Sequence, residues 1–304
     1  VFKKACYTPA YKVAKTCLFA DDTSLMLSHS NKDILELNCF KESNTLLQWC
    51  EENHLLMNAE KTQFLNFCIS QRSTRATNGI SSILLDDKIV NPTNQVKFLG
   101  VILDDNLKFY QHLEHVTKRI SVGIFMLRLL RQTVGIEVLM SAYYGLVYPY
   151  LAYAVPAWGS KSQRTLFLFR LKEKPSALFF LFQVKHPVKF FKIFNILTFP
   201  SIYILETLSF AHNNKSIFDN PTNSRYPLRN STNIPIPKHS STFFKQHFLY
   251  SSIKLHNSLS LSLKTEQDHR RFRSNLKALL ATNAYYSIRE FTGKYLKTVS
   301  KTST

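Results

Sequence analysis

Two adjacent carboxylates, Asp21 and Asp22, are the residues best suited to chemistry. They follow the aromatic Phe19 and a small residue, and runs rich in apolar and β-branched residues flank them at 12–18 and 23–27. This pattern predicts a β-hairpin with the carboxylates at its tip. Neighbouring carboxylates repel each other, and their oxygen atoms are the ligands that divalent cations such as Mg²⁺ prefer. The tip is therefore a candidate divalent-metal site.

Two further pairs, Asp86-Asp87 and Asp104-Asp105, allow a comparison within the chain. Asp is common in turns because its side chain accepts hydrogen bonds from nearby backbone N–H groups. One pair lies between two short apolar runs, and the other ends an apolar run before a helical pattern, so both are predicted to be turn or cap residues. An aromatic residue and tight apolar strands distinguish the first pair. Its residues alone leave metal binding and an ordinary turn equally open.

The whole chain of 304 residues has a formal net charge of +19, and the positive charge is concentrated in its second half. Residues 1–150 carry 16 Lys and Arg against 14 Asp and Glu, whereas residues 151–304 carry 23 against 6. Such an excess usually indicates an anionic partner, and nucleic acid is the commonest one. A basic surface that serves only solubility is the alternative.

The five cysteines all precede residue 70 and include no Cys-x-x-Cys pair or His at ligand spacing. This argues against a structural zinc site and a disulfide framework, and it favours a cytoplasmic or nuclear location. Residues 138–159 contain no charged side chain. Pro149 and Pro156 interrupt this stretch, so we expect a buried helix followed by a loop and no membrane span.

Apolar periodicity predicts an α+β fold for residues 1–105, with a helix packed on a small, mainly antiparallel sheet. The helix is expected to begin at a capping box, Ser30-x-x-Asp33, and to end near Asn53. Strands are expected at 64–68, 83–85, 88–90 and 96–103.

Beyond residue 105 the period becomes helical. A helix is predicted with one apolar face, and a second helix over 136–148 is expected to stop near Pro149. The predicted apolar face consists of Leu113, Val116, Ile120, Ile124 and Leu127. Phe-rich helical runs are expected over 165–210, interrupted at Pro175, Pro187 and Pro200, and helical patterns return at 242–257, 270–280 and 285–291.

Several segments, in order, resemble the reverse transcriptases of non-LTR retrotransposons of the jockey and CR1-like kind. Residues 16–23 resemble the catalytic palm hairpin, and residues 49–62 resemble the helix and the Leu-x-Asn-x-x-Lys-Thr element that follow it. Residues 96–104 resemble the Phe-Leu-Gly-Val-x-x-Asp primer-grip region, and residues 148–159 match the tyrosine–tryptophan element that ends the thumb.

The resemblance implies a partial palm at 1–105, made of an antiparallel sheet with a helix, and a helical thumb at 106–160. It further implies a Phe/Lys-rich helical segment at 161–212, a linker or extended loop at 213–241, and a basic helical C-terminal segment at 242–304.

The same resemblance implies an RNA-directed DNA polymerase that uses two Mg²⁺ ions, an RNA template, a DNA primer and deoxynucleoside triphosphates. Asp21 and Asp22 would be the catalytic metal ligands. Lys61 would assist the departure of pyrophosphate, although a solvated lysine is an equal alternative. Phe98, Leu99 and Gly100 would form the primer grip. The residues expected to contact the nucleic-acid backbone are Lys118, Arg119, Arg128 and Arg131.

Part of the family's catalytic machinery has no counterpart in these residues. The two-metal site also needs an aspartate from a strand before the hairpin, yet residues 1–20 contain no carboxylate. The fingers and the endonuclease domain are also missing, and residues 172–192 depart from the family pattern. We therefore expect the isolated chain to be inactive. The alternative is a non-catalytic, basic nucleic-acid-binding module derived from a retroelement.

Overall fold

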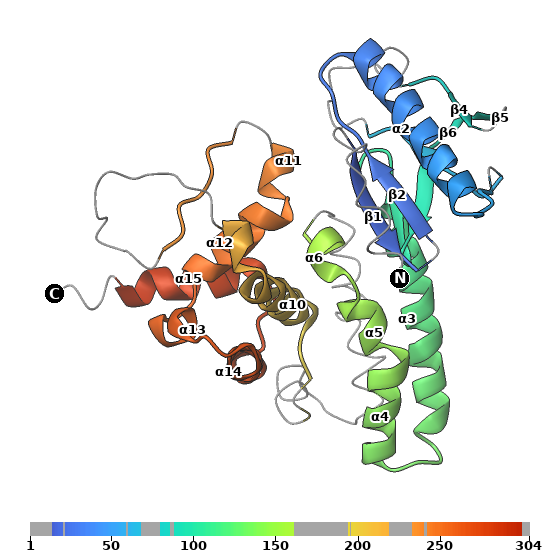
Figure 1. The fold of residues 1–304 in the computed structure, drawn as a ribbon. Helices are drawn as coiled ribbons and strands as arrows, with labels where there is room; N and C mark the ends of the chain where they lie inside the picture. Colours follow the sequence, from blue (N-terminus) through green and yellow to red (C-terminus); the bar gives the residue numbers. More distant parts are fainter. Residues whose placement is uncertain are drawn as a thin grey trace. The chain divides into compact units, whose positions relative to one another are not determined.

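The computed structural model (Figure 1) describes residues 14–20, 22–58, 60–67, 80–85, 88–160, 194, 196–218, 233–239 and 242–299. The chain divides into two compact units, residues 1–107 and 108–304. Within the described residues, the first unit combines short strands with a helix, and the second is built from helices. The predicted α+β class is confirmed.

Short strands in the first unit form four two-stranded sheets within the described residues. Three are antiparallel: β1 (Lys15–Phe19) with β2 (Asp22–Met26), β4 (Ile83–Leu85) with β5 (Lys88–Val90), and β7 (Gln95–Phe98) with β8 (Val101–Asp104). The fourth is parallel and pairs β3 (Phe64–Leu65) with β6 (Pro92–Thr93). The expected single sheet is thus replaced by separate ladders. The strand expected at 64–68 is observed as β3, whereas its partner β6 gave no signal because two residues are too few to show an alternating pattern.

The predicted strand at 96–103 is wrong, because the chain turns back at its centre. β7 ends at Phe98 and β8 begins at Val101, and these two residues face each other across the hairpin. Leu99 and Gly100 have φ values of 45° and 82°. Positive φ at both central residues is the pattern of a type I′ turn, which matches the twist of a tight hairpin.

Helix α2 (Lys32–Glu52) packs against β4 and buries Cys39, Glu42 and Leu46. Its cap is Asn31 rather than Ser30. The Asn31 Oδ1 atom accepts hydrogen bonds from the backbone N–H groups of Asp33 at 2.8 Å and Ile34 at 3.2 Å. Asn is as good a cap as Ser, so neighbouring candidates cannot be separated by residue type alone.

The second unit begins with α3 (Tyr110–Leu130), α4 (Ile136–Leu146), α5 (Tyr148–Ala152) and α6 (Val155–Trp158). All five predicted apolar positions of α3 are buried. The helix expected at 136–148 ends at Leu146, and Pro149 lies in the first turn of α5, where a missing N–H group costs little. Among the described helices, none is both long and apolar enough to cross a membrane.

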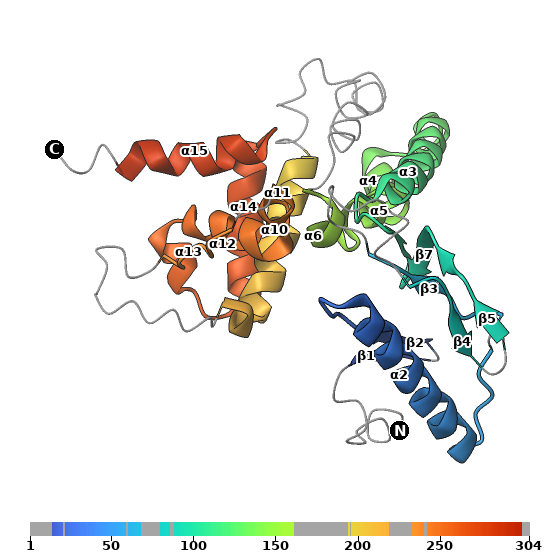
Figure 2. The same cartoon turned by 90° about the horizontal axis from the view of Figure 1, so that it is seen from above.

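The C-terminal helices surround α10 (Phe199–Asn213), which is buried along most of its length (Figure 2). It packs against α12 (Phe248–Asn257) and α14 (His269–Asn283). Pro200 lies in the first turn of α10, where proline is tolerated, and residues 196–198 before it are not helical. The shorter elements are η1 (Lys215–Phe218), α11 (Thr242–Lys245) and α13 (Leu261–Thr265), and α15 (Ile288–Val299) follows α14.

Several expectations concern residues outside the described part of the chain. This group contains Pro175 and Pro187 within 161–193, all of which lies outside the described residues, and 219–232 and 240–241 in the expected linker. The described residues 233–239 form neither helix nor strand. Helical patterning at 242–257 and 270–280 is observed, whereas the last helix begins at Ile288 rather than near residue 285.

Candidate catalytic hairpin and nucleic-acid interface

The β1–β2 hairpin places Asp22 at its tip. Asp22 begins β2 and faces Phe19, the last residue of β1, across a loop of two residues. Ala20 opens this loop with φ 52°, in the left-handed region that tight hairpin turns require. Asp22 is exposed, and Phe19 is 61% exposed. Asp21, the second loop residue, lies outside the described residues.

The donor chemistry of the tip suits a hard divalent cation. The Asp22 carboxylate supplies oxygen atoms that are accessible to solvent, and oxygen is the ligand that Mg²⁺ prefers. Within the described residues, no three or more His, Cys, Asp or Glu side chains gather as a metal site. Asp21 is not among the described residues. Of the predicted pair, the structure therefore describes the Asp22 carboxylate.

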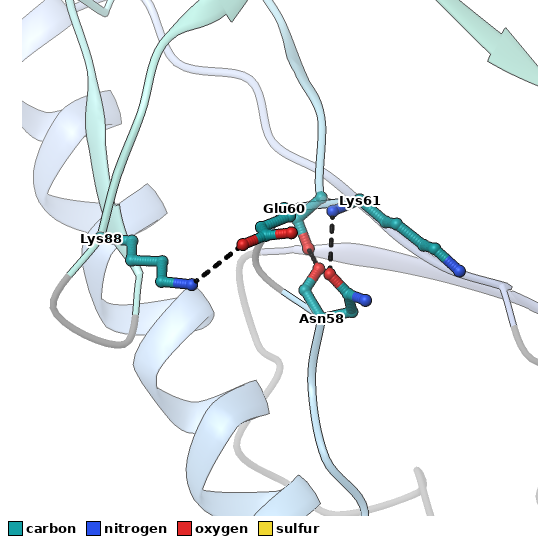
Figure 3. A network of polar contacts seen from close by, with 5 residues as sticks. Asn58, Glu60, Lys61 and Lys88 are labelled. Atoms are coloured by element: carbon teal, nitrogen blue, oxygen red, sulfur yellow. Dashed lines mark hydrogen bonds and ion pairs between the residues drawn. The ribbon is translucent and has the colours of Figure 1, made fainter.

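Lys61 lies in a turn after α2 that Asn58 organises (Figure 3). The Lys61 N–H group donates to Asn58 Oδ1 at 3.1 Å and to the Asn58 carbonyl oxygen at 3.2 Å. Glu60 forms an exposed ion pair with Lys88 of β5 at 3.6 Å. The Lys61 side chain extends away from Lys88, so the ammonium group of Lys61 takes no part in that pair. Its exposure suits either a phosphate contact or simple solvation.

The expected primer-grip residues occupy the β7–β8 turn. Gly100 adopts positive φ without penalty, whereas Leu99 does so against the clash of its Cβ atom. The third Asp-Asp pair ends β8 at Asp104 and opens a turn at Asp105, where the Asp104 carbonyl oxygen accepts a hydrogen bond from the Leu107 N–H group at 3.0 Å. That pair therefore lies in a turn, as expected.

The predicted basic residues of α3 do not share one face of the helix. Lys118, Arg119 and Arg128 are exposed, and Arg131 is half-buried. Lys118 pairs with Glu114 at 3.0 Å one turn earlier, which neutralises part of its charge.

Sequence reasoning missed an apolar strip on the exposed side of α3. Val122, Phe125 and Leu129 lie four, seven and eleven residues after Lys118, so they share its face, and each is more than half exposed. Met126 lies beside them and is 44% exposed. At about 100° per residue, Arg119 and Arg128 flank this strip on opposite sides. Apolar residues at these spacings, outside the face predicted to be buried, are the signal that identifies the strip.

These candidate residues belong to both units. Asp22, Lys61 and the Leu99–Gly100 turn lie in the first unit, on different two-stranded sheets or their connections, and the basic residues of α3 lie in the second.

One curated protein is similar to part of the chain. A probable RNA-directed DNA polymerase from transposon BS of Drosophila melanogaster is 28% identical to the chain over 144 residues. The predicted resemblance to a transposon reverse transcriptase is confirmed. The aligned region makes up 46% of the chain, and the chain spans 16% of the length of this transposon polymerase. No protein-family model and no solved structure matches the chain.

Proposed function

We propose that the chain supplies part of the palm and the thumb of an RNA-directed DNA polymerase, with Asp21 and Asp22 as metal ligands. The observation that carries the proposal is the tight β1–β2 hairpin, which presents the exposed Asp22 at its tip. The similarity to the Drosophila transposon polymerase supports the same reaction class.

Asp21 and Asp22 would hold Mg²⁺, which when bound would lower the pKa of a primer hydroxyl and neutralise charge on a nucleoside triphosphate. The chain's own residues hold and position the reactants. The exposed ring of Phe19 offers an apolar surface beside the two carboxylates for the primer terminus. Lys61, whose ammonium group extends away from the Glu60–Lys88 pair, contacts the departing pyrophosphate.

The turn at 98–100 and helix α3 bind the nucleic acid. Phe98, Leu99 and Gly100 form the primer grip. Arg119 and Arg128 contact phosphates on either side of the apolar strip, while Lys118 and Arg131 add positive charge. Phosphate contacts of this kind give affinity and register without reading sequence, as copying any template requires.

The 304-residue polypeptide by itself should not extend a primer. Two cations need several carboxylate oxygens, and these residues contain no carboxylate before Asp21. The test is RNA-templated primer extension in Mg²⁺, with the chain alone and with finger and upstream palm segments placed before Val1. We expect extension only from the longer protein.

An Asp22→Asn substitution in the longer protein should lower the extension rate by about a thousandfold, comparable to losing a main electrostatic group of an active site. Asp87→Asn, in the second Asp-Asp pair, is the matched control and should leave the rate unchanged. An unchanged rate in the Asp22 variant would refute the catalytic assignment.

A second function, nucleic-acid binding without catalysis, is favoured by the charge of residues 151–304. If this half acts alone, a fragment of residues 151–304 should bind an RNA–DNA duplex as tightly as the whole chain. On the polymerase proposal, this fragment should bind more weakly because it lacks the primer grip at 98–100 and the basic residues of α3.

A further inference from the structure

The C-terminal helices line a cavity of about 250 Å³ that is partly open to solvent and that none of the proposed catalytic residues lines. Its wall comes from α10, η1, α12, α13, α14 and the segment at residue 234. Its size lies just below the ~300–1,000 Å³ typical of sites for drug-sized ligands. A ligand no larger than one nucleotide therefore suits it.

The polar lining of the cavity is entirely basic. Lys215, Lys264, His212 and His256 line it, and none of its described lining residues is acidic. The Lys264 ammonium group is fixed by hydrogen bonds to Asn233 Oδ1 at 2.7 Å and to the Asn257 carbonyl oxygen at 3.0 Å. An ammonium group donates three hydrogen bonds, so one donor of Lys264 remains after these two.

Hydrogen bonds fix the wall of the cavity beside Lys264. Asn257 accepts a hydrogen bond from the Ile234 N–H group and donates one to the Ile234 carbonyl oxygen, both at 2.9 Å. This reciprocal pair ties the segment at 233–239 to the end of α12. The side chain of Lys264 is thereby held at the cavity with little freedom left to lose on binding.

Both histidines keep a buried nitrogen atom with no hydrogen-bond partner among the described residues, the Nδ1 atom in each case. In His212 the Nε2 atom lies 2.9 Å from the Glu266 carbonyl oxygen, which can only accept, so Nε2 carries the hydrogen. Burial and then the charge of Lys264 lower the pKa of His256. A bound anion would offset both effects and give a protonated Nδ1 atom an acceptor.

Two phenylalanine rings, Phe218 and Phe272, belong to the apolar part of the lining, beside the aliphatic residues Leu208, Ala211, Ile234 and Leu263. His212 stacks on Phe272 with ring centroids 4.3 Å apart and planes 14° apart. Phe218 is the last residue of η1, and its ring centroid lies 6.1 Å from that of His256. Nucleic-acid bases stack on such rings irrespective of sequence.

We propose that this cavity binds one nucleotide, with its phosphate between Lys215, Lys264 and His256 and its base against Phe218. The choice of a nucleotide over another phosphate ester rests on the proposed function. The nucleotide is supplied either free or within a single-stranded RNA.

The test measures binding of three probes to the 304-residue chain by calorimetry: inorganic phosphate, adenosine monophosphate and a short single-stranded RNA. We expect the nucleotide to bind at least tenfold more tightly than phosphate. Lys215→Glu should weaken nucleotide binding at least tenfold, the scale of a lost charge-assisted hydrogen bond. Lys254→Glu makes the same charge change on the exposed side of α12, outside the cavity lining, and should change little.

The Phe218→Ala variant distinguishes the contribution of the base to binding from that of the phosphate. It should weaken nucleotide binding about fivefold or more and leave phosphate binding unchanged. Equal weakening by Lys215→Glu and Lys254→Glu would show a general charge effect and overturn the proposal. Phosphate that binds as tightly as the nucleotide would also overturn it.

Competition identifies the source of the nucleotide. RNA that displaces adenosine monophosphate shows that the cavity takes a nucleotide of a single strand, and RNA that leaves it bound shows that the ligand is free. No template or Mg²⁺ is present, and Asp22→Asn should leave the binding unchanged. Failure at the cavity is thus distinct from failure of the polymerase assignment.

Discussion

Protonation of His112 should destabilise the second unit in mild acid. His112 lies in the first turn of α3, is 3% exposed, and meets the ring of Trp158 edge-on with centroids 5.4 Å apart. Burial, and secondly the charge of His115, lower the pKa of His112 to about 4. In the unfolded chain a histidine has its ordinary pKa of about 6.5.

The direction in which the free energy of unfolding changes with pH follows from proton binding. Between pH 6.5 and pH 4 the unfolded chain holds more protons than the folded chain, so the free energy of unfolding falls as the pH falls. The stabilisation is fully present above pH 6.5. With these two pKa values, the part lost between pH 7 and pH 4.5 is about 2 kcal/mol.

Urea unfolding from pH 4.5 to pH 7 measures this loss. His112→Gln removes the titrating group, so the wild type should lose about 2 kcal/mol more than this variant over that range. His115→Gln is the control and should keep most of the loss, because burial is the larger cause. Parallel pH profiles for the wild type and His112→Gln would refute the reasoning.

Three further substitutions and one control test helix packing, an ion pair and a helix cap, each by urea unfolding. Gly123→Ala should destabilise by about 1–2 kcal/mol, because its Cβ atom would lie 2.8 Å from the Leu146 carbonyl oxygen. Gly145→Ala is its control: its Cβ atom meets nothing within 4 Å, so a gain of up to ~1 kcal/mol is expected. Arg273→Lys should cost about 1 kcal/mol, because Glu206 loses one of its bonds at 2.6 and 3.1 Å. Asn31→Ala should cost about 1 kcal/mol through its lost cap. A gain from Gly123→Ala, or no loss from the other two, would contradict these contacts.

Elements with a long, clear period are predictable from the sequence. The apolar face of α3 repeats over four turns, and all five of its predicted positions are buried. The β1–β2 hairpin is likewise predictable, because apolar strands flank a compact polar pair. In both cases local pattern and tertiary burial favour the same structure.

Features that depend on distant residues or on unfavourable backbone geometry are not predictable in this way. Leu99 occupies a left-handed position that its residue type disfavours, so the β7–β8 turn is hidden in an apolar run. The cavity joins His212 to Lys264, which are far apart in the sequence, and neither belongs to a motif. The spacing of the apolar strip on α3 can be found in the sequence, but the sequence does not indicate what packs against the strip.

The most direct test of the central claim is a titration of the 304-residue chain with Mn²⁺, a paramagnetic substitute for Mg²⁺, followed by electron paramagnetic resonance. If Asp21 and Asp22 are the metal ligands of a polymerase palm, their double Asn variant should lose the strongest Mn²⁺ binding. The double Asn variant at Asp86 and Asp87 removes the same charge from the pair that the sequence predicts to be turn residues, and it should retain that binding. Equal losses in the two variants, or no loss at Asp21 and Asp22, would contradict the account.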